Sequence, residues 1–151
     1  MIKLKLRNLE KKDKYLLFRW ANLKSVIKNS LSKKKITNTV HEKWFNKKIK
    51  SKTDILKIIV YKDVPIGVIR LEKKKLNYFI SYLITPRYRK KGNAYNSLKI
   101  FLAFLKKRNK NFKVIALVKK DNNPSIKIFE KLKFKLIKTQ LKIFKFSYKI
   151  N

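Results

Sequence analysis

Arg89-Lys90-Lys91-Gly92-Asn93-Ala94 lies between a β-rich run that ends at Thr85-Pro86 and an amphipathic run over residues 93–108. Proline cannot donate to a strand ladder and restricts the residue before it, so a strand ends there. The apolar spacing after the segment predicts a helix whose buried face is formed by Leu98, Phe101, Leu102 and Leu105. Backbone N–H groups are unpaired at a helix start and the helix dipole attracts anions, so the segment predicts a phosphate-binding site.

Glycine is rare in this chain, and Gly67 and Gly92 are its only two glycines. A sequence that retains so few glycines is expected to keep them where a side chain is not tolerated. Gly92 would let the backbone approach phosphate oxygens, and the small Ala94 would keep the first helical turn uncrowded. The plainer alternative is a basic loop between a strand and a helix, because lysine is common throughout the sequence.

The surrounding periodicity predicts a single domain over residues 1–151 with the order β-α-α-β-β-β-α-β-α-β-β. Strands are expected over residues 2–7, 55–61, 66–71, 76–84, 113–118, 134–138 and 141–149, and helices over 11–21, 41–50, 93–108 and 123–132. Thr39 and Glu42 have capping-box spacing before the second helix. Lys62-Asp63-Val64-Pro65 predicts a turn. A crossover helix between strands 76–84 and 113–118 would make them parallel neighbours in a mostly antiparallel seven-stranded sheet of the α/β (α+β) class.

Composition excludes several classes of function. The chain has no cysteine, so it has no disulfide framework, no thiolate metal site and no cysteine nucleophile. We expect no metal. No run approaches the length of a membrane span and no signal-peptide core is present, so we expect a cytoplasmic protein without a membrane span.

The net charge of +35 raises the question of an anionic partner. Lysine outnumbers arginine 37 to 6, as an AT-rich genome would write, and the lysines are dispersed along the chain. We therefore interpret most of the charge as a solvated surface and the rest as attraction for anionic ligands. No recognised nucleic-acid motif appears, so no specific nucleic-acid partner is expected.

A second motif follows about thirty residues after the first, where Val118-x-x-x-Asn122-x-x-Ser125-x-x-x-Phe129-x-Lys131-x-x-Phe134 leaves a strand and enters a helix. Together with Arg89-x-x-Gly92-x-Ala94, the hairpin around Pro65-Ile66-Gly67 and the element order, this motif resembles the GCN5-related N-acetyltransferases (GNAT) over essentially the whole chain. The resemblance implies the GNAT fold, with about four helices and two splayed parallel central strands.

The resemblance also implies acetyl-coenzyme A as co-substrate. Its pantetheine arm would pair with the backbone near Leu83 and Ile84, and its pyrophosphate would rest on Arg89, Lys90, Lys91, Gly92, Asn93 and Ala94. Asn122 and Ser125 would line the far wall, with Phe129 and Lys131 from the same motif. Plain helix capping is the alternative role for Asn122 and Ser125.

The catalytic residues are harder to assign. Relatives often carry a tyrosine that protonates the departing thiolate, whereas this chain has Phe129, and Lys133 replaces the glycine usual before Phe134. None of the eight carboxylates falls on strand 76–84, where relatives often place a glutamate. His41 and Tyr82 are the remaining candidates; His41 is either a base or substrate contact, or a capping and packing residue.

The acceptor is predicted to be a primary amine. Arg7-x-Leu9, Trp20-Ala21-Asn22, Ser30, Ile36 and His41-x-x-Trp44-Phe45 look like acetyltransferases that acylate nucleotide-linked amino sugars, as in pseudaminic acid-type pathways. Substrate contacts would then come from Trp20, Asn22, His41, Trp44 and Tyr82, although the aromatic residues would equally fill the core. A protein N-terminal acetyltransferase of the ribosomal type and a non-catalytic acyl-CoA-binding module are the alternatives. The sequence leaves monomer and homodimer open.

Overall fold

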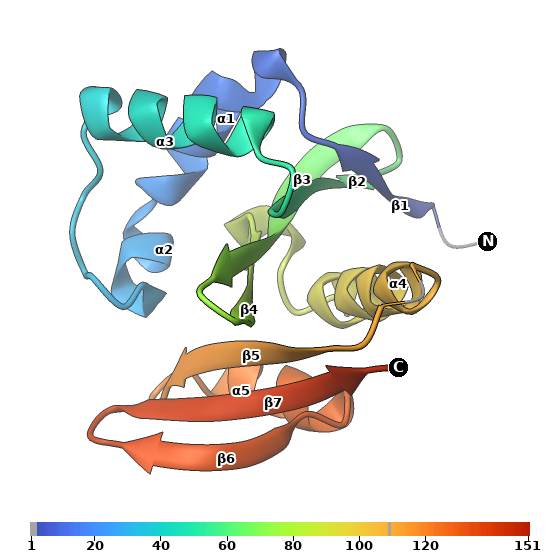
Figure 1. The fold of residues 1–151 in the computed structure, drawn as a ribbon. Coiled ribbons are helices and arrows are strands. Elements are labelled where there is room, and N and C mark those ends of the chain that lie inside the picture. The colour runs from blue at the N-terminus through green and yellow to red at the C-terminus, as the bar shows by residue number, and fades with distance from the viewer. Residues whose placement is uncertain (1–2, 109) are drawn as a thin grey trace.

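The computed structural model describes residues 3–108 and 110–151, and residue 2 of the first predicted strand lies outside this part. The chain forms one sheet of seven strands, whose spatial order is β1-β2-β3-β4-β5-β7-β6 (Figure 1). Its strands are β1 (Leu4–Asn8), β2 (Ile55–Tyr61), β3 (Val64–Lys74), β4 (Asn77–Ile84), β5 (Phe112–Lys119), β6 (Lys135–Gln140) and β7 (Ile143–Ile150). Neighbours are antiparallel except β4 and β5, which are parallel, as the crossover helix between them predicts.

Five α-helices accompany the sheet in the described residues: α1 (Lys14–Ala21), α2 (Lys24–Asn29), α3 (Asn38–Lys50), α4 (Asn93–Lys106) and α5 (Asn123–Lys131). Two short 3-10 turns add to them, η1 (Lys11–Asp13) and η2 (Pro86–Tyr88). Helices α1 and α3 lie above the β1–β3 part of the sheet and α2 lies at its left in Figure 1, whereas α4 and α5 pack on the other face.

Two apolar clusters hold these layers to the sheet. The larger one joins α4 and α5 to the sheet through buried residues that include Phe101, Phe129 and Phe146. The smaller one packs Leu17, Trp20 and Phe45 of α1 and α3 against Ile58, Val60 and Val68. Since side chains alternate across a strand, the clusters define two faces of the sheet, an α3 face and an α4 face.

Two details of the N-terminal helices differ from the predictions. Helix α3 begins at Asn38 and is capped by Thr37, whose hydroxyl accepts from the backbone N–H of Val40, so the predicted capping box of Thr39 and Glu42 is wrong. Helix α2 was not predicted, because it has six residues and buries none of them. A helix without a buried face leaves no apolar periodicity in the sequence.

The hairpin between β2 and β3 is tighter than predicted. Its turn is Lys62-Asp63, where both residues have positive φ, and β3 already begins at Val64 with Pro65 inside it. Gly67 follows where β4 crosses closely, because a Cβ added there would lie 2.1 Å from the carbonyl oxygen of Leu83. This glycine is therefore kept for close backbone packing.

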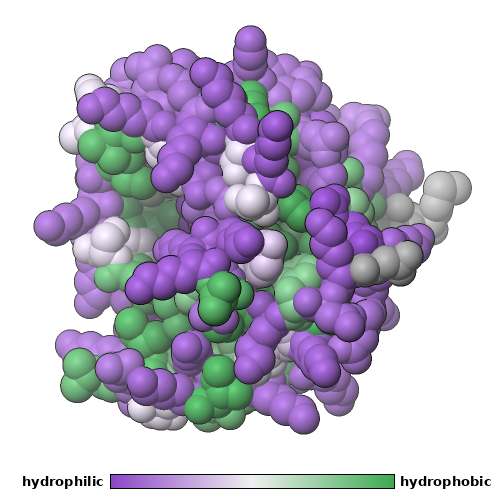
Figure 2. All heavy atoms as spheres, viewed as in Figure 1, coloured by the Kyte–Doolittle hydropathy of each residue, from purple (hydrophilic) through white to green (hydrophobic). Residues whose placement is uncertain are grey.

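The surface reflects the composition. Hydrophilic side chains cover most of the face seen in Figure 2, in keeping with 43 lysines and arginines against eight carboxylates. Within the described residues, no helix has the length and hydropathy needed to cross a membrane.

Candidate active site: a gap in the sheet beside helix α4

The central strands β4 and β5 separate soon after they meet. Within the described chain, their ladder consists of two register pairs, Tyr78 with Val114 and Phe79 with Ile115. Five more residues of β4 and four more of β5 continue beyond these pairs without facing each other. The GNAT resemblance predicted such a splay, and it leaves a gap inside the sheet.

The gap exposes backbone groups of β4. The backbone N–H of Thr85 donates to the carbonyl of Ile66 on β3 (2.9 Å). Hydrogen-bonded and non-bonded pairs alternate along an antiparallel ladder, so Leu83 also turns its backbone groups toward β3. Tyr82 and Ile84 then turn theirs toward the gap, which shifts the expected backbone contact from Leu83 and Ile84 to Tyr82 and Ile84.

The segment Arg89–Ala94 closes one end of the gap. Gly92 is the N-cap of α4 with φ of 77°, and Lys90 also has positive φ at 58°. The first intrahelical bond at this end runs from Asn96 N–H to the Gly92 carbonyl (3.0 Å), so the N–H groups of Asn93, Ala94 and Tyr95 have no intrahelical partner. No side chain caps this helix. Its open N-terminus is thus available to an anion.

Hydrogen bonds fix the shape of this segment. Arg89 Nε donates to the carbonyl of Ile84 (2.8 Å), Asn93 Nδ2 donates to that of Tyr88 (2.9 Å), and Ser97 Oγ donates to that of Asn93 (2.6 Å). Burial lowers the pKa of the Arg89 guanidinium, although arginine remains charged. Because Arg89 is tied to the end of β4, its charge is positioned beside the gap instead of projecting into solvent.

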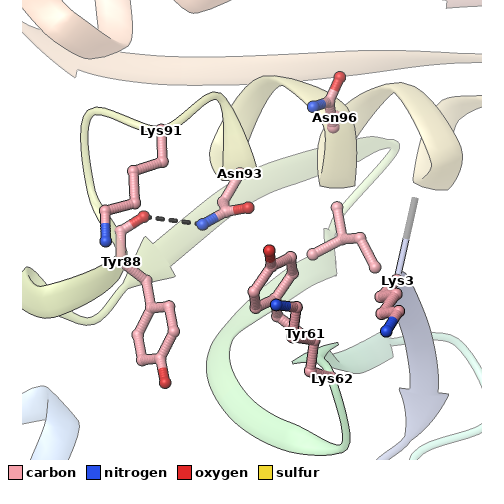
Figure 3. Close-up of a pocket in the computed structure, with 8 residues that line it drawn as sticks. Lys3, Tyr61, Lys62, Tyr88, Lys91, Asn93 and Asn96 are labelled. Atoms are coloured by element: carbon pink, nitrogen blue, oxygen red, sulfur yellow. Dashed lines mark hydrogen bonds between the residues drawn. The ribbon is translucent and has the colours of Figure 1, made fainter. Parts of the chain in front are cut away.

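A hollow of about 430 Å³ lies on the other side of the α4 N-terminus, toward β1 and β2 (Figure 3). Tyr61 and Tyr88 meet edge to face in it, with ring centres 6.3 Å apart. Its wall includes Lys91 and Asn93 of the segment Arg89–Ala94, together with Tyr88 just before it. The segment therefore forms a partition between this hollow and the gap.

The far wall of the gap comes from α5. Asn122 is the N-cap of α5 and accepts from the backbone N–H of Ser125 (3.4 Å), as its capping alternative predicts. The Ser125 hydroxyl is 2.6 Å from that of Tyr82 on β4, so a hydrogen bond spans the gap. Burial raises the pKa of Tyr82, which keeps its hydroxyl protonated. Tyr82 also packs against Phe129, 6.0 Å between ring centres.

Lys131, the last residue of α5, turns back toward α4. Its ammonium lies 4.2 Å from the centre of the Tyr95 ring, and Phe129 beside it is buried. Of the second motif, Ser125 thus reaches across to β4, Asn122 caps α5, and Phe129 packs behind them in the core.

The substrate residues predicted from the N-terminal third lie on α1, on α3 and at the end of α1. His41 is buried among Phe18, Trp44 and Phe45, and its Nε2 is hydrogen-bonded to the carbonyl of Lys14 (2.9 Å), which favours the packing alternative. Trp20 lies in the smaller apolar cluster, which also favours packing.

Asn22 and Trp44 have different surroundings. The Asn22 amide exchanges two hydrogen bonds with the backbone of Ile36, at 2.9 and 2.7 Å, and so fixes the chain between α2 and α3. Trp44 is half-buried on α3, and the guanidinium of Arg70 lies 5.7 Å from the centre of its ring. Trp44 therefore lies beside a charged side chain of β3.

Two charged residues on the α3 face, Arg70 and Lys119, were not predicted from the sequence. Arg70 of β3 donates through Nε to Ser81 Oγ of β4 (3.1 Å). Lys119, at the end of β5, is buried and donates to the carbonyl of Lys28 on α2. Arginine is scarce in this chain, and that scarcity is the signal that could have identified Arg70. Nothing in the local pattern distinguishes Lys119 from the other lysines.

Lys119 also borders a hollow of about 410 Å³ between α2 and the end of β5. Four lysines and a single carboxylate line it together with one apolar residue: Lys24, Ile27, Lys28, Lys33, Lys119 and Asp121. We call this the lysine hollow. Among the described residues, no group of three or more histidine, cysteine or carboxylate side chains is close enough to hold a metal ion.

A gap between parallel strands, bordered by an uncapped helix N-terminus, suits an extended ligand that carries an anionic group. Residues 3–135 match the family model of the acetyltransferase (GNAT) domain, and the chain belongs to this family of acyltransferases. No protein of curated function matches the chain in sequence.

Solved structures share its fold. A domain from Methanocaldococcus jannaschii is 22% identical with a TM-score of 0.86, and the match covers 99% of both chains. Spermidine N-acetyltransferase from Vibrio cholerae, solved with CoA and spermine, is 16% identical with a TM-score of 0.86, covering 98% of this chain and 96% of that one. RimL, a ribosomal alpha-N-protein acetyltransferase solved with CoA, is 13% identical with a TM-score of 0.83, covering 98% and 94%.

Proposed function

We propose that this acetyltransferase transfers the acetyl group of acetyl-CoA to the amino group of a UDP-linked amino sugar. The observation that carries the proposal is the pairing of an uncapped α4 N-terminus with a gap in the sheet, and a lysine-rich hollow on the opposite face. The first two features suit a ligand with a pyrophosphate and an extended arm. The third suits an anionic acceptor.

The cofactor site follows from the free backbone groups. The N–H groups of Asn93, Ala94 and Tyr95 point out of the α4 N-terminus, where a pyrophosphate would accept from them and meet the positive end of the helix dipole. An extended pantetheine arm would pair with the free edge of β4 as an additional strand does. Asn122 and Ser125 would face it from α5.

The chemistry asks little of the side chains beyond position. A neutral amine held beside the acetyl group attacks its carbonyl, and the free backbone N–H of Ile84 or Tyr82 donates to the oxygen as negative charge develops there. The protonated hydroxyl of Tyr82 would then supply a proton to the departing sulfur as the carbon–sulfur bond breaks. The new amide nitrogen would release its extra proton to solvent water, and the Tyr82 phenolate would regain a proton from solvent. Tyr82 would thus provide the donor that Phe129 lacks, from the other wall of the gap.

The acceptor is inferred from charge. Spermidine N-acetyltransferase shares the fold, but a polycationic acceptor needs carboxylates, and the lysine hollow has one carboxylate against four ammonium groups. A nucleotide-linked sugar carries two phosphates and would be attracted by the same surface. The lysine hollow therefore favours the nucleotide sugar over a polyamine.

The cofactor site is tested at Gly92. Its φ of 77° is open to glycine and tolerated by asparagine, but it is strained for β-branched residues. We expect Gly92→Val to weaken acetyl-CoA binding at least about tenfold by calorimetry, since several donors would move. Gly92→Asn is the matched control and should bind nearly as well as the wild type. Equal affinity of the valine variant would contradict the site.

The acceptor is tested by thiol release from acetyl-CoA over a panel of UDP-amino sugars, peptides and polyamines. We expect turnover with a UDP-amino sugar. Turnover with a peptide alone would replace the acceptor, and binding of acetyl-CoA without turnover on any amine would indicate a non-catalytic module.

A further inference from the structure

The α3 face of the sheet carries a guanidinium that the cofactor site does not use. Arg70 lies on the central strand β3, on the same face as Val68 and the helices above it. We propose that Arg70 binds a phosphate of the acceptor and thereby selects anionic amines. This rests on the proposed function in one respect, that the acceptor enters the gap from the α3 face.

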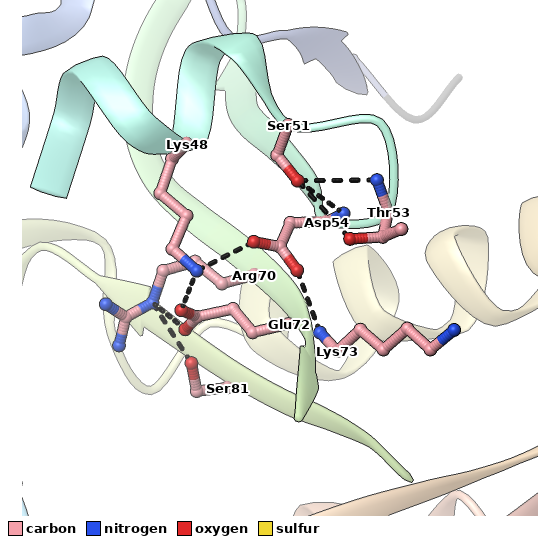
Figure 4. A network of polar contacts seen from close by, with 8 residues as sticks. All are labelled: Lys48, Ser51, Thr53, Asp54, Arg70, Glu72, Lys73 and Ser81. Carbon is pink, nitrogen blue, oxygen red and sulfur yellow. Dashed lines mark hydrogen bonds and ion pairs between the residues drawn. The ribbon is translucent and has the colours of Figure 1, made fainter. Parts of the chain in front are cut away.

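Arg70 is held so that one edge of its guanidinium is fixed and the other is open. Nε donates to Ser81 Oγ, and the group lies against the ring of Trp44. Within the described chain, neither Nη1 nor Nη2 has a hydrogen-bond acceptor, and 39% of the side chain is exposed. Figure 4 shows these two nitrogens pointing away from the polar network. Planar N–H donors of this kind match a phosphate in two-point contact.

The neighbouring carboxylates are engaged elsewhere. Lys48 of α3 contacts Asp54 at 2.7 Å and Glu72 at 2.6 Å, and its side chain is only 10% exposed (Figure 4). Glu72 is 3.9 Å from Arg70 Nε, a much looser contact. The Lys48 cluster thus ties α3 to β3 and fixes the strand that carries Arg70, while leaving the open edge of Arg70 for a ligand.

The position of Arg70 fits an acceptor that reaches the gap. Its partner Ser81 is two residues beyond Phe79, where the β4–β5 ladder ends, and Leu83 is two residues further on the same face. Residues two apart on a strand are about 6.6 Å apart. A sugar ring with a phosphate at one end and an amine at the other has a comparable span, so both groups could be held at once.

The lysine hollow continues the positive surface across the gap. Ile115 of β5 faces the same side as Phe79, its register partner, and Lys119 is four residues further along that face. A diphosphate acceptor would therefore meet positive charge on both sides of the gap. An acceptor with a single carboxylate would not need positive charge on both sides. This favours a nucleotide diphosphate over an amino acid as the anionic acceptor.

The residue type supports a ligand role. Lysine would suffice as a counter-charge for Glu72, and lysine stands at 37 of the 43 basic positions. Arginine differs by its planar fork, which binds phosphate at two points and stacks on an aromatic ring. Retaining arginine beside Trp44 and Ser81 is explained by that geometry rather than by charge alone.

The test is binding of UDP to the CoA-loaded protein, measured by calorimetry at 150 mM salt to suppress non-specific attraction. We compare wild type, Arg70→Lys and Arg70→Gln, with Arg108→Lys as the control because that arginine is exposed near the C-terminal end of α4. Arg70→Lys keeps the charge but removes the fork, and we expect it to weaken UDP binding at least about tenfold. Arg108→Lys should bind as the wild type does.

Equal UDP affinity of wild type and Arg70→Lys would overturn the inference, and so would an absence of UDP binding by the wild type. The outcome is separable from the proposed function. If UDP binding depends on Arg70 but no amine is acetylated, the phosphate site stands and the proposed reaction falls. If a UDP-amino sugar is acetylated equally well by wild type and Arg70→Lys, the reaction stands and this inference falls.

Discussion

Tyr82 is the side chain that we propose as the proton donor of the reaction. Its hydroxyl bridges the gap to Ser125, and burial raises its pKa, so it can donate at neutral pH. We expect Tyr82→Phe to lower kcat by about 100-fold, the usual contribution of a general acid, with little change in acetyl-CoA affinity.

The control for Tyr82 is Tyr78→Phe. Tyr78 lies on the same strand but packs against Phe112 with the two rings tilted and their centres 4.6 Å apart, before the gap opens. Removing the Tyr78 hydroxyl in Tyr78→Phe should leave kcat near the wild-type value. An unchanged kcat for Tyr82→Phe would remove Tyr82 from the chemistry and leave the departing sulfur to take its proton from water.

Lys133 occupies a backbone conformation that suits glycine. It follows α5 with φ of 69°, and the N–H of the next residue, Phe134, returns to the carbonyl of Phe129 (3.0 Å). This is a helix C-terminal motif in which glycine avoids the strain of a Cβ. Lys133→Gly should raise the free energy of unfolding by about 1 kcal/mol. Denaturant unfolding would measure it.

The opposite sign is expected at Lys127, which is exposed in the middle of α5. Glycine there should lower stability by about 1 kcal/mol, because it adds backbone freedom to the unfolded chain. If Lys133→Gly also destabilised the protein, the left-handed conformation of that residue would not be the source of strain.

At the scale of elements, the Lys48 cluster couples α3 to the sheet in a pH-dependent way. Burial opposes ionisation of Asp54, but the hydrogen bonds from Lys48 and from the Lys73 N–H outweigh it, so its pKa lies below the ordinary 3.8. Burial likewise lowers the pKa of Lys48, and its two carboxylate partners more than reverse this, so its pKa lies above 10.5.

These directions set the signs. A lowered carboxylate pKa contributes stability above its unfolded value, and the contribution is lost as pH falls through the folded value. A raised lysine pKa contributes fully below about 10.5 and is lost as pH rises through the folded value. We expect Asp54→Asn to cost about 2 kcal/mol at pH 7.

The cost of Asp54→Asn should shrink as pH falls below 3.8, where the wild-type carboxylate also becomes neutral. Urea unfolding at pH 7 and at the lowest pH where the protein stays folded would measure it. A cost that does not change with pH would mean that Asp54 acts through its size and not its charge.

Helices and strands were predictable from the sequence where their apolar residues form one buried face. All seven strands and four of the five α-helices were predicted, because apolar period and turn residues agree there. Helix α2 was missed because it buries no residue. The cap of α3 was misplaced because two threonines lie near the helix start, and Thr37, not Thr39, accepts the capping hydrogen bond. The place of Arg89–Ala94 at a helix start was predictable because its glycine and the preceding proline are local in sequence, and its binding of a phosphate stays a prediction.

The contacts within the candidate site were not predictable, because they pair residues that are distant in sequence. Tyr82 with Ser125 and Arg70 with Ser81 are contacts between different elements. His41 and Trp20 have residue types that suit a site, and only the packing of α1 and α3 shows that both are buried.

At the scale of the molecule, the charge of +35 sets a balance between stability and binding. Like charges repel in the compact state, and salt screens them over about 10 Å at 0.1 M. We expect the Tm to rise between 20 and 200 mM salt, while the affinity for anionic acetyl-CoA falls over the same range. Thermal unfolding and calorimetry would measure the two trends.

A triple variant provides the control. Replacing the exposed Lys34, Lys35 and Lys74 with glutamine removes three charges from the surface and should reduce the dependence of Tm on salt. A Tm that falls with salt in the wild type would indicate that its ion pairs outweigh the repulsion.

The short ladder between β4 and β5 also determines how stiff the molecule is. The sheet has two parts, strands β1–β4 on one side and strands β5–β7 on the other. Within the sheet they are joined by two residue pairs at one end. Across the open end, the two parts are linked by the hydrogen bond between Tyr82 and Ser125, by the packing of Tyr82 against Phe129 and by the larger apolar cluster. A ligand lying along the free edge of β4 would connect the two parts of the sheet. Without such a ligand, we expect the sheet to be least rigid at its open end, where the proposed reaction requires precise alignment.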